Sequence, residues 1–171
     1  MTLDAMFGAA VTVPDVIARD AAAAIRDRAA FHRYALLDRG SYDIDALDAP
    51  SAALVPIFSA LIATATRVTG RPSLAVTDAR LLRLLPGDYL LAHHDRILDG
   101  NPVEVTADLS PAPVPGAEIH YRRRGQVFHR VPCVPGSVAV VERGPTVTCN
   151  HTYVSKLHEH ASVVRLVVLL R

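Results

Sequence analysis

Two histidines and one aspartate in the second half of this 171-residue chain have the types and spacing of a metal site. His93 and Asp95 lie two positions apart at the end of a predicted strand, and side chains at positions i and i+2 of a strand point to the same face. A third ligand must come from another strand, and His151 ends one. Two imidazoles and one carboxylate on one side of an ion leave its other side open, which suits a non-haem Fe(II) that must also bind a cosubstrate and O2.

The His-x-Asp pair carries little weight alone. Eight histidines and 13 aspartates occur among the 171 residues, so chance gives about 0.6 such pairs. The alternative interpretation of the pair is a surface histidine beside a turn-capping aspartate. The third ligand also stays open, because His158 and His160 form a His-x-His pair in a polar segment, and His158 is the next choice after His151.

The elements that would position these residues change character near residue 75. Before it, the pattern predicts helices over 15–30 and 51–68, the second closed by Gly70, and an edge strand over 34–37 that is broken by 40–43. After it, short apolar runs alternate with Gly- and Pro-rich turns, as in β-sandwiches and barrels. Eight strands are predicted there, over 80–84, 89–93, 103–109, 117–122, 126–130, 137–142, 146–151 and 163–170. We therefore expect a single domain over 1–171, with a helical support region at 1–75 and a jelly-roll core at 76–171.

Three further basic residues, Arg122, Arg123 and Arg124, precede Gly125 in a predicted hairpin turn. The ordinary interpretation is a solvated tip, and the alternative is a patch that binds a phosphate or carboxylate of a substrate. On the strand before that turn, His120 and Tyr121 are neighbours, so only one of them can face the barrel interior.

Composition argues against several classes of partner. The formal net charge of +1 gives no electrostatic case for nucleic acid or an acidic membrane, and no apolar run reaches the ~18 residues that a spanning helix needs. Cys133 and Cys149 lack Cys-x-x-Cys spacing and are too few for a disulfide framework, which is typical of free thiols in a reducing compartment. The N-terminus has no basic segment of the kind that opens a signal peptide. We expect a cytoplasmic protein that acts on a small molecule, as a monomer or a homodimer.

Several segments in order resemble the Fe(II)/2-oxoglutarate-dependent oxygenases, in their prolyl-hydroxylase-like branch. The run 81–95, LLRLLPGDYLLAHHD, resembles the strand, Pro-Gly turn and His-x-Asp segment of that family. The resemblance continues at 105–110 (VTADLS), 116–121 (GAEIHY) and 135–141 (PGSVAVV). It covers about residues 80–171 and implies a mainly β protein, with a double-stranded β-helix core buttressed by two N-terminal helices.

The resemblance also implies roles for single residues. His93, Asp95 and His151 match the iron ligands, and Arg165 matches the arginine that pairs with the distal carboxylate of 2-oxoglutarate. A guanidinium binds a carboxylate through two parallel hydrogen bonds. Because an unpaired buried charge is unfavourable, an arginine within an apolar strand should point into a pocket with an anionic partner.

The sequence departs from the pattern of that branch in two places. Leu84 stands where the branch has an aromatic residue that touches 2-oxoglutarate, and Tyr89 from the next strand is the proposed substitute. The spacing of 14 from His151 to Arg165 is longer than in the prolyl hydroxylases.

The function implied by the resemblance is that of an oxygenase using Fe(II), 2-oxoglutarate and O2. The cosubstrate would be converted to succinate and CO2 while a C–H bond of a substrate is oxidised. Asp95 stands where halogenating members have a small residue, which favours hydroxylation, or a related desaturation or cyclisation. We expect a small metabolite, such as an amino acid or natural-product intermediate, ahead of a protein side chain. The alternatives are a cupin-like metal dioxygenase or isomerase that needs no Arg165, and a binding protein that has lost its chemistry.

Overall fold

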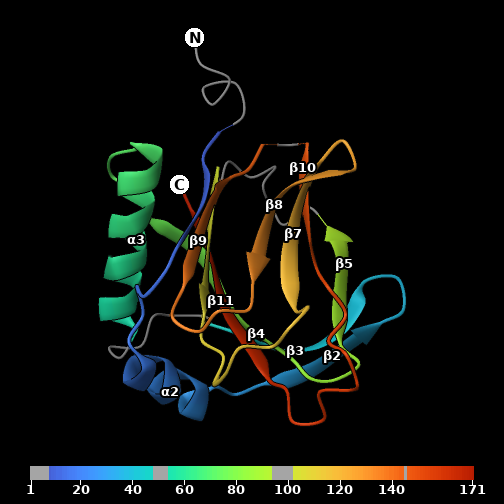
Figure 1. Ribbon diagram of the computed structural model, residues 1–171. Helices are drawn as coiled ribbons and strands as arrows, with labels where there is room; N and C mark the ends of the chain where they lie inside the picture. Colours follow the sequence, from blue (N-terminus) through green and yellow to red (C-terminus); the bar gives the residue numbers. More distant parts are fainter. Residues whose placement is uncertain (1–7, 48–53, 94–101, 145) are drawn as a thin grey trace.

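The computed structural model describes residues 8–47, 54–93, 102–144 and 146–171 (Figure 1). Its helices are α2 (Arg19–Arg28) and α3 (Val55–Thr69). Its strands are β1 (Ala10–Val13), β2 (His32–Leu36), β3 (Gly40–Ala46), β4 (Val76–Leu84), β5 (Tyr89–His93), β6 (Val103–Asp108), β7 (Glu118–Arg123), β8 (Gln126–Pro132), β9 (Val138–Glu142), β10 (Val147–His151) and β11 (Val163–Leu170). Neither described helix is long and apolar enough to cross a membrane.

Eight of the eleven described strands form two layers of four, and β1 extends the first layer by pairing with β9. Neighbours in the sheet follow the order β1-β9-β6-β11-β4-β3-β5-β10-β7-β8, with β2 paired to β3 and every pairing antiparallel. One layer is β4, β11, β6 and β9, and the other is β5, β10, β7 and β8 (Figure 1). From β4 to β11, consecutive strands lie in opposite layers, except for β7 and β8, which form a hairpin within one layer. β3 joins the layers by pairing with β4 and β5. This confirms the expected double-stranded β-helix, or jelly roll, with flanking helices.

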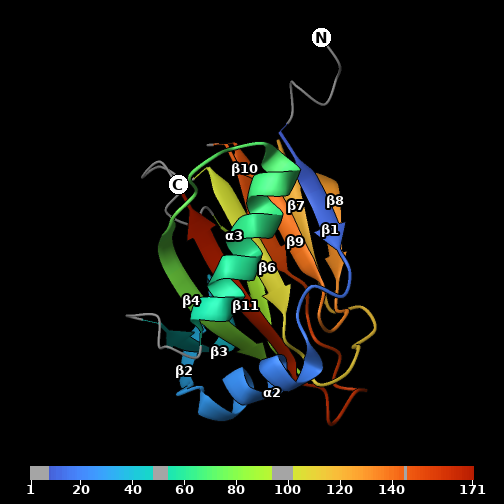
Figure 2. The same ribbon diagram turned by 90° about the vertical axis from the view of Figure 1, so that its left-hand side faces the viewer.

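Both helices lie on the outer side of the first layer. Figure 2 shows α3 running across the face of the layer that contains β4, β11, β6 and β9, with α2 at one end of it. The helix predicted over 51–68 is observed as α3, with a proline in its first turn. It ends at Gly70 as expected, because Gly70 adopts φ +69° and donates its N–H to Thr66 O at 2.9 Å.

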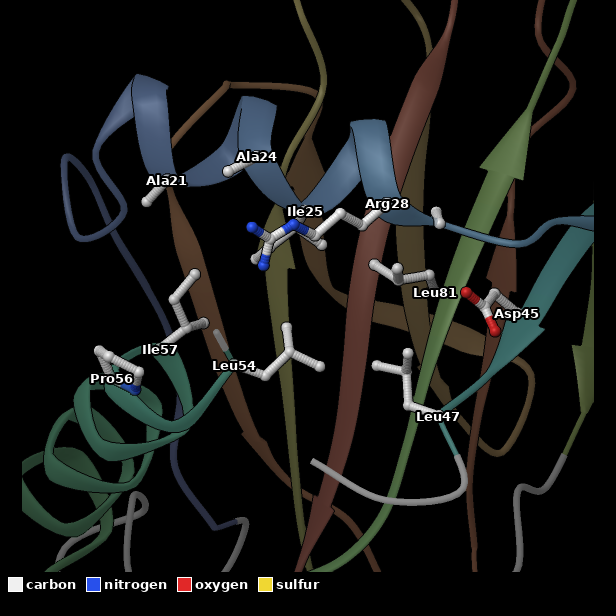
Figure 3. Close-up of a pocket in the computed structure, with 11 residues that line it drawn as sticks. Ala21, Ala24, Ile25, Arg28, Asp45, Leu47, Leu54, Pro56, Ile57 and Leu81 are labelled. Atoms are coloured by element: carbon white, nitrogen blue, oxygen red, sulfur yellow. The ribbon is translucent and has the colours of Figure 1, made fainter. Parts of the chain in front are cut away.

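A pocket of about 400 Å³ separates α2 from the start of α3 (Figure 3). Its walls are mostly apolar and include Ile25 from α2, Leu54 and Ile57 at the start of α3, and Leu81 from β4, while Arg28 and Asp45 add two charged side chains. Leu81 faces outward on β4, toward the helices, while its neighbour Leu82 faces the space between the two layers. The pocket is therefore separated from the barrel interior by the first layer of strands.

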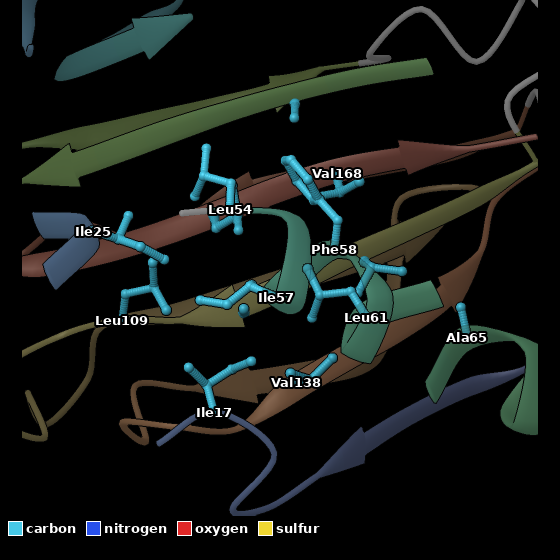
Figure 4. Close-up of a cluster of buried hydrophobic side chains, with 14 of the residues drawn as sticks. Ile17, Ile25, Leu54, Ile57, Phe58, Leu61, Ala65, Leu109, Val138 and Val168 are labelled. Atoms are coloured by element: carbon cyan, nitrogen blue, oxygen red, sulfur yellow. The ribbon is translucent and has the colours of Figure 1, made fainter. Parts of the chain in front are cut away.

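Next to that pocket, the helices and the first layer enclose the largest buried apolar cluster (Figure 4). Ile57, Phe58, Leu61 and Ala65 recur at three- and four-residue spacing, so they form one stripe along α3. They pack against the outward-facing residues of β6 and β11, such as Val168. Burial of this stripe fixes the layer from which Arg165 projects in the opposite direction.

The first 75 residues contain more strand than the sequence pattern predicts. The expected helix over 15–30 is confined to Arg19–Arg28, because Asp15 adopts φ +53° and the backbone N–H groups of the next two residues are bonded outside the helix. Val16 and Ile17 both donate their backbone N–H groups to Gly136 O, at 2.9 and 3.0 Å. The edge strand predicted over 34–37 is observed as β2, and this region adds two strands that were not predicted, β1 and β3.

The predicted break at 40–43 is wrong, since these residues begin β3. The turn lies before them, and Gly40 pairs with Leu90 of β5. A Cβ on Gly40 would lie 2.4 Å from Tyr89 O, closer than any side chain can approach. Gly40 thus serves a close approach of two strands, one of the uses of glycine within a sheet.

Candidate functional site

The strands that carry the two candidate histidine ligands are hydrogen-bonded neighbours. On β10, Cys149 is paired with His93 of β5, and His151 is paired with Leu90. Between these pairs β5 advances by one residue more than β10, which is a β-bulge. Bulges of this kind change which residues face a site and are frequent next to active sites. Asp95, the candidate carboxylate ligand, lies outside the described residues.

The approach to β5 is held by a buried carboxylate in the turn after β4. Asp88 is buried, accepts the N–H of Leu85 at 2.9 Å, and forms an ion pair with Arg33. Burial raises the pKa of Asp88, but hydrogen bonds from Arg33, Leu85 and Ser41 lower it further, so the net shift is downward. Gly87 in the same turn adopts φ +98° and donates its N–H to Val154 O at 2.8 Å. This network fixes where β5 begins.

His151 and Arg165 meet inside the barrel. His151 is 4% exposed and Arg165 is 1% exposed. Arg165 donates from Nη1 to His151 Nδ1 at 3.0 Å and from Nη2 to the carbonyl oxygen of Ala117 at 3.0 Å. Because a guanidinium has no acceptor, His151 Nδ1 must accept this bond, which puts the proton of a neutral imidazole on Nε2. The sequence-based expectation that Arg165 points inward is confirmed.

A carboxylate lies opposite Arg165 on the neighbouring strand, because Asp108 of β6 is paired with Arg165. It forms no ion pair with Arg165 among the contacts of the described residues. Burial lowers the pKa of Arg165, and the negative charge of Asp108 opposes that shift. Sequence reasoning missed Asp108, although polar residues at every second position of β6 (Glu104, Thr106 and Asp108) are a signal of one polar face.

A second polar group fills another part of the interior. Glu104 is buried, accepts a hydrogen bond from Tyr121 Oη at 2.6 Å, and forms an ion pair with buried Arg143. Burial raises the pKa of Tyr121 well above its usual range, and the charge of Glu104 adds to the shift. Tyr121 is therefore the inward-facing member of its pair, while His120 bonds Glu118 Oε2 at 2.7 Å. Apolar side chains complete the wall beside Arg165, namely Leu82, Leu84, Leu90, Val163 and Val167.

Tyr89 is not brought to Arg165. Leu90 packs in the interior cluster beside Val163 and Val167. Successive residues of a strand face opposite sides, so Tyr89 lies on the outer face of β5, where it is half-buried and paired with Ser41. In this arrangement Tyr89 faces away from Arg165, and its contact with a cosubstrate stays a prediction.

The alternative ligands His158 and His160 lie in the segment between β10 and β11. His158 is half-buried and His160 is exposed, and both line a pocket of about 330 Å³ beside the 111–115 segment. Within the part of the chain that the structure describes, no three His, Cys, Asp or Glu side chains are grouped so as to hold a metal ion. The choice of third ligand therefore stays a prediction.

The arginines near the β7–β8 hairpin make local contacts. Arg122 donates from Nε to Asn150 Oδ1 at 3.0 Å, and the Arg123 guanidinium lies 5.0 Å from the ring centre of Phe128. Arg124 adopts φ +50° in the turn itself. These contacts fit a structured surface tip, while the anion-binding alternative stays untested.

Comparison with solved structures identifies the fold. A Pseudomonas putida prolyl-4-hydroxylase aligns with a TM-score of 0.74 at 18% identity, over 98% of this chain and 95% of the other. An oxidoreductase of the 2OG-Fe(II) oxygenase family from Burkholderia pseudomallei aligns at 0.73 and 14% identity, over 95% and 85%. The fold is that of the 2OG-Fe(II) oxygenases.

This fold carries more than one reaction. A non-heme alpha-ketoglutarate-dependent carbocyclase of nogalamycin biosynthesis aligns with a TM-score of 0.70 at 15% identity, over 99% of this chain and 83% of the other. No family model matches the sequence, and no curated protein sequence matches it. The similarity therefore lies in the arrangement of the strands, and function must be argued from the side chains.

Proposed function

We propose that this protein is a non-haem Fe(II)- and 2-oxoglutarate-dependent oxygenase. His93, Asp95 and His151 would hold the iron, and Arg165 would bind the distal carboxylate of 2-oxoglutarate. The observation that carries the proposal is the buried guanidinium of Arg165, whose hydrogen bonds go to an imidazole and a carbonyl oxygen. A cosubstrate carboxylate would give it the charged, two-bond partner that a guanidinium prefers.

The donor set fits iron. Two imidazoles and a carboxylate are the ligands of the open, three-ligand sites of non-haem oxygenases. His151 lies on the strand paired with β5, so its position is compatible with a ligand shared with His93. Binding through Nε2 requires that nitrogen to lose its proton, and Nδ1 would then carry one. The bond from Arg165 to Nδ1 must therefore be given up when the metal binds.

The two roles support each other, because the cosubstrate carboxylate would offer Arg165 a new partner as His151 is released. The apolar wall of Leu82, Leu90 and Val163 would exclude water from the bound cosubstrate. Iron, when bound, supplies the redox chemistry with O2 that couples decarboxylation of 2-oxoglutarate to oxidation of a substrate. The protein contributes ligand geometry, charge and a dry pocket.

For the substrate, we propose a small metabolite such as an amino acid or natural-product intermediate. The near-neutral charge of the chain supports this, because it offers no field that would attract a charged polymer. Asp95 favours hydroxylation, or a related desaturation or cyclisation, over halogenation.

Metal binding by ligand variants tests the proposal. Equilibrium dialysis under anaerobic conditions should give one Fe(II) per wild-type chain. His93→Ala, Asp95→Ala and His151→Ala should each weaken binding by about 10-fold or more. His158→Ala and His160→Ala are matched controls and should bind as the wild type does. Loss of binding in His158→Ala with retention in His151→Ala would reassign the third ligand, and no Fe(II) binding by the wild type would overturn the proposed function.

A further inference from the structure

The interior row of residues that includes Arg165 also contains a carboxylate to which the proposed function gives no role. Arg165 is paired with Leu82 on one side and with Asp108 on the other. Paired residues of antiparallel strands share a face and have Cβ atoms about 5 Å apart. Asp108 donates its backbone N–H to Ser137 O at 2.9 Å, which extends the row by one strand. Asp108 thus adjoins the site proposed for the distal end of the cosubstrate.

Asp108 is held in place but incompletely satisfied. It is 2% exposed, and its Oδ1 accepts the N–H of Ser110 at 2.9 Å. Its Oδ2 is buried and has no hydrogen-bond partner among the described residues, and the same is true of Ser137 Oγ beside it. A buried carboxylate oxygen without a donor is unfavourable. A ligand that brings a donor to this point would make a bond that these side chains leave unmade.

Arg165 and Asp108 make opposite demands on a ligand. The guanidinium only donates hydrogen bonds, and the carboxylate only accepts them. A free carboxylate satisfies Arg165 but places a second negative charge beside Asp108, and like charges at this range repel. A primary carboxamide satisfies both residues, because its oxygen accepts from Arg165 while its amino group donates to Asp108.

We propose that Asp108 sets the ligand specificity of the Arg165 subsite, against a free distal carboxylate and in favour of a group that combines an acceptor with a donor, such as a primary carboxamide. This inference rests on the proposed function, since it takes the ligand to be a 2-oxo acid that reaches Arg165. It adds that the wild-type protein binds 2-oxoglutarate less tightly than it binds the same 2-oxo acid with a distal carboxamide. Asp108 is a specificity residue, and it takes no part in the oxidation.

Two unreactive isosteres of the cosubstrate test this directly. N-oxalylglycine ends in a carboxylate, and N-oxalylglycinamide is the same molecule with a distal carboxamide. Calorimetric titration of the Mn(II)-loaded wild-type protein should give a lower Kd for the carboxamide. In Asp108→Asn, the Kd for N-oxalylglycine should fall by about tenfold or more, because the repulsion between two carboxylates is removed. The Kd for the carboxamide should change little.

Thr106→Val is the matched control. Thr106 lies two positions before Asp108 on the same polar face of β6, and its hydroxyl is also buried without a partner among the described residues. It carries no charge, so this variant should keep the wild-type ratio of the two Kd values. The wild-type ratio is itself a test, so the comparison holds even if Asp108→Asn does not fold.

The outcomes separate the two proposals. Binding of neither isostere to wild type or variant would overturn the proposed function. Tighter binding of N-oxalylglycine by the wild type, with no change in Asp108→Asn, would leave the proposed function standing and overturn the role of Asp108.

Discussion

Arg165 donates a hydrogen bond from Nη1 to Nδ1 of His151 across 3.0 Å, deep inside the barrel. The bond joins the residue proposed to bind the cosubstrate to the residue proposed as third iron ligand. It uses the nitrogen that carries the proton when a histidine ligates through Nε2. The arrangement without ligands therefore differs from the one needed for chemistry, and the two residues must separate as the site fills.

Replacing Arg165 by methionine should split the two binding events. Arg165→Met removes the donor to His151, so Mn(II) should bind as tightly as in the wild type or more tightly. The affinity for 2-oxoglutarate should fall about 100-fold, because two charge-assisted hydrogen bonds are lost. Electron paramagnetic resonance of free Mn(II) and calorimetry measure the two affinities, with circular dichroism as the check on folding. Weaker Mn(II) binding in a folded Arg165→Met protein would contradict the view that the hydrogen bond from Arg165 to His151 competes with metal binding.

Asp88 should make the free energy of unfolding depend on pH in the acidic range. Its pKa in the folded protein lies below the usual value of an aspartate, so the folded state favours the charged form. The stabilisation is present above the unfolded pKa and is lost as pH falls through the folded pKa. Asp88→Asn should lower the free energy of unfolding by about 1–3 kcal/mol at neutral pH.

The difference between wild type and Asp88→Asn should shrink in urea titrations as pH falls below about 4. Asp38→Asn, in the exposed turn before β3, is the control and should change stability little at any pH. A difference for Asp88→Asn that stays constant with pH would argue against the ion pair as the source of its effect.

Removing the carboxylate of Glu104 should destabilise the protein far more than removing the hydroxyl group of Tyr121. Glu104→Ala removes the carboxylate that pairs with buried Arg143, which should destabilise by about 3–5 kcal/mol. Tyr121→Phe removes one hydrogen bond to Glu104 and should cost about 1 kcal/mol. Chemical denaturation gives both values. Equal, small effects would mean that the pair contributes little to stability.

Leu61 reports how far α3 supports the barrel. Its side chain is fully buried between α3 and the first layer, and Leu61→Ala should destabilise by about 2–5 kcal/mol. Ser59→Ala, on the exposed side of the same helix, should change stability by less than about 0.5 kcal/mol. Thermal and urea unfolding distinguish the two, and similar losses in both variants would point to a helix held by its own propensity.

The sequence pattern predicts the second half of the fold well, because its turns and apolar runs are local signals. The eight strands expected after residue 75 are all present, although β4 begins at Val76 instead of Arg80. The first half is harder, because β1 and β3 are strands through partners far along the chain, β9 for β1 and both β4 and β5 for β3. β2, a local hairpin partner of β3, matches the edge strand predicted over 34–37, whereas the bonds that shorten α2 come from Gly136. No local pattern encodes such pairings.

For the site, the inward direction of Arg165 follows from an isolated charge in an apolar strand. The partner of Arg165 cannot be predicted in this way, because the contact with His151 depends on where β10 ends relative to β11. The face of β5 on which Tyr89 lies could not be predicted from the sequence, since it depends on the register of β5 with β10 and β3. Asp108 could have been found from the alternation of β6, yet its relation to Arg165 requires the pairing of β6 with β11.

On the proposed function, one barrel interior holds both iron and a 2-oxo acid bound to Arg165. The most direct test is an anaerobic titration of the apoprotein with Fe(II) and then 2-oxoglutarate, followed by visible absorption. The wild-type protein should give a metal-to-ligand charge-transfer band at saturating 2-oxoglutarate, and Arg165→Ala should need a much higher 2-oxoglutarate concentration for the same band. A wild-type protein that binds Fe(II) but gives no band at saturation would contradict the proposed function.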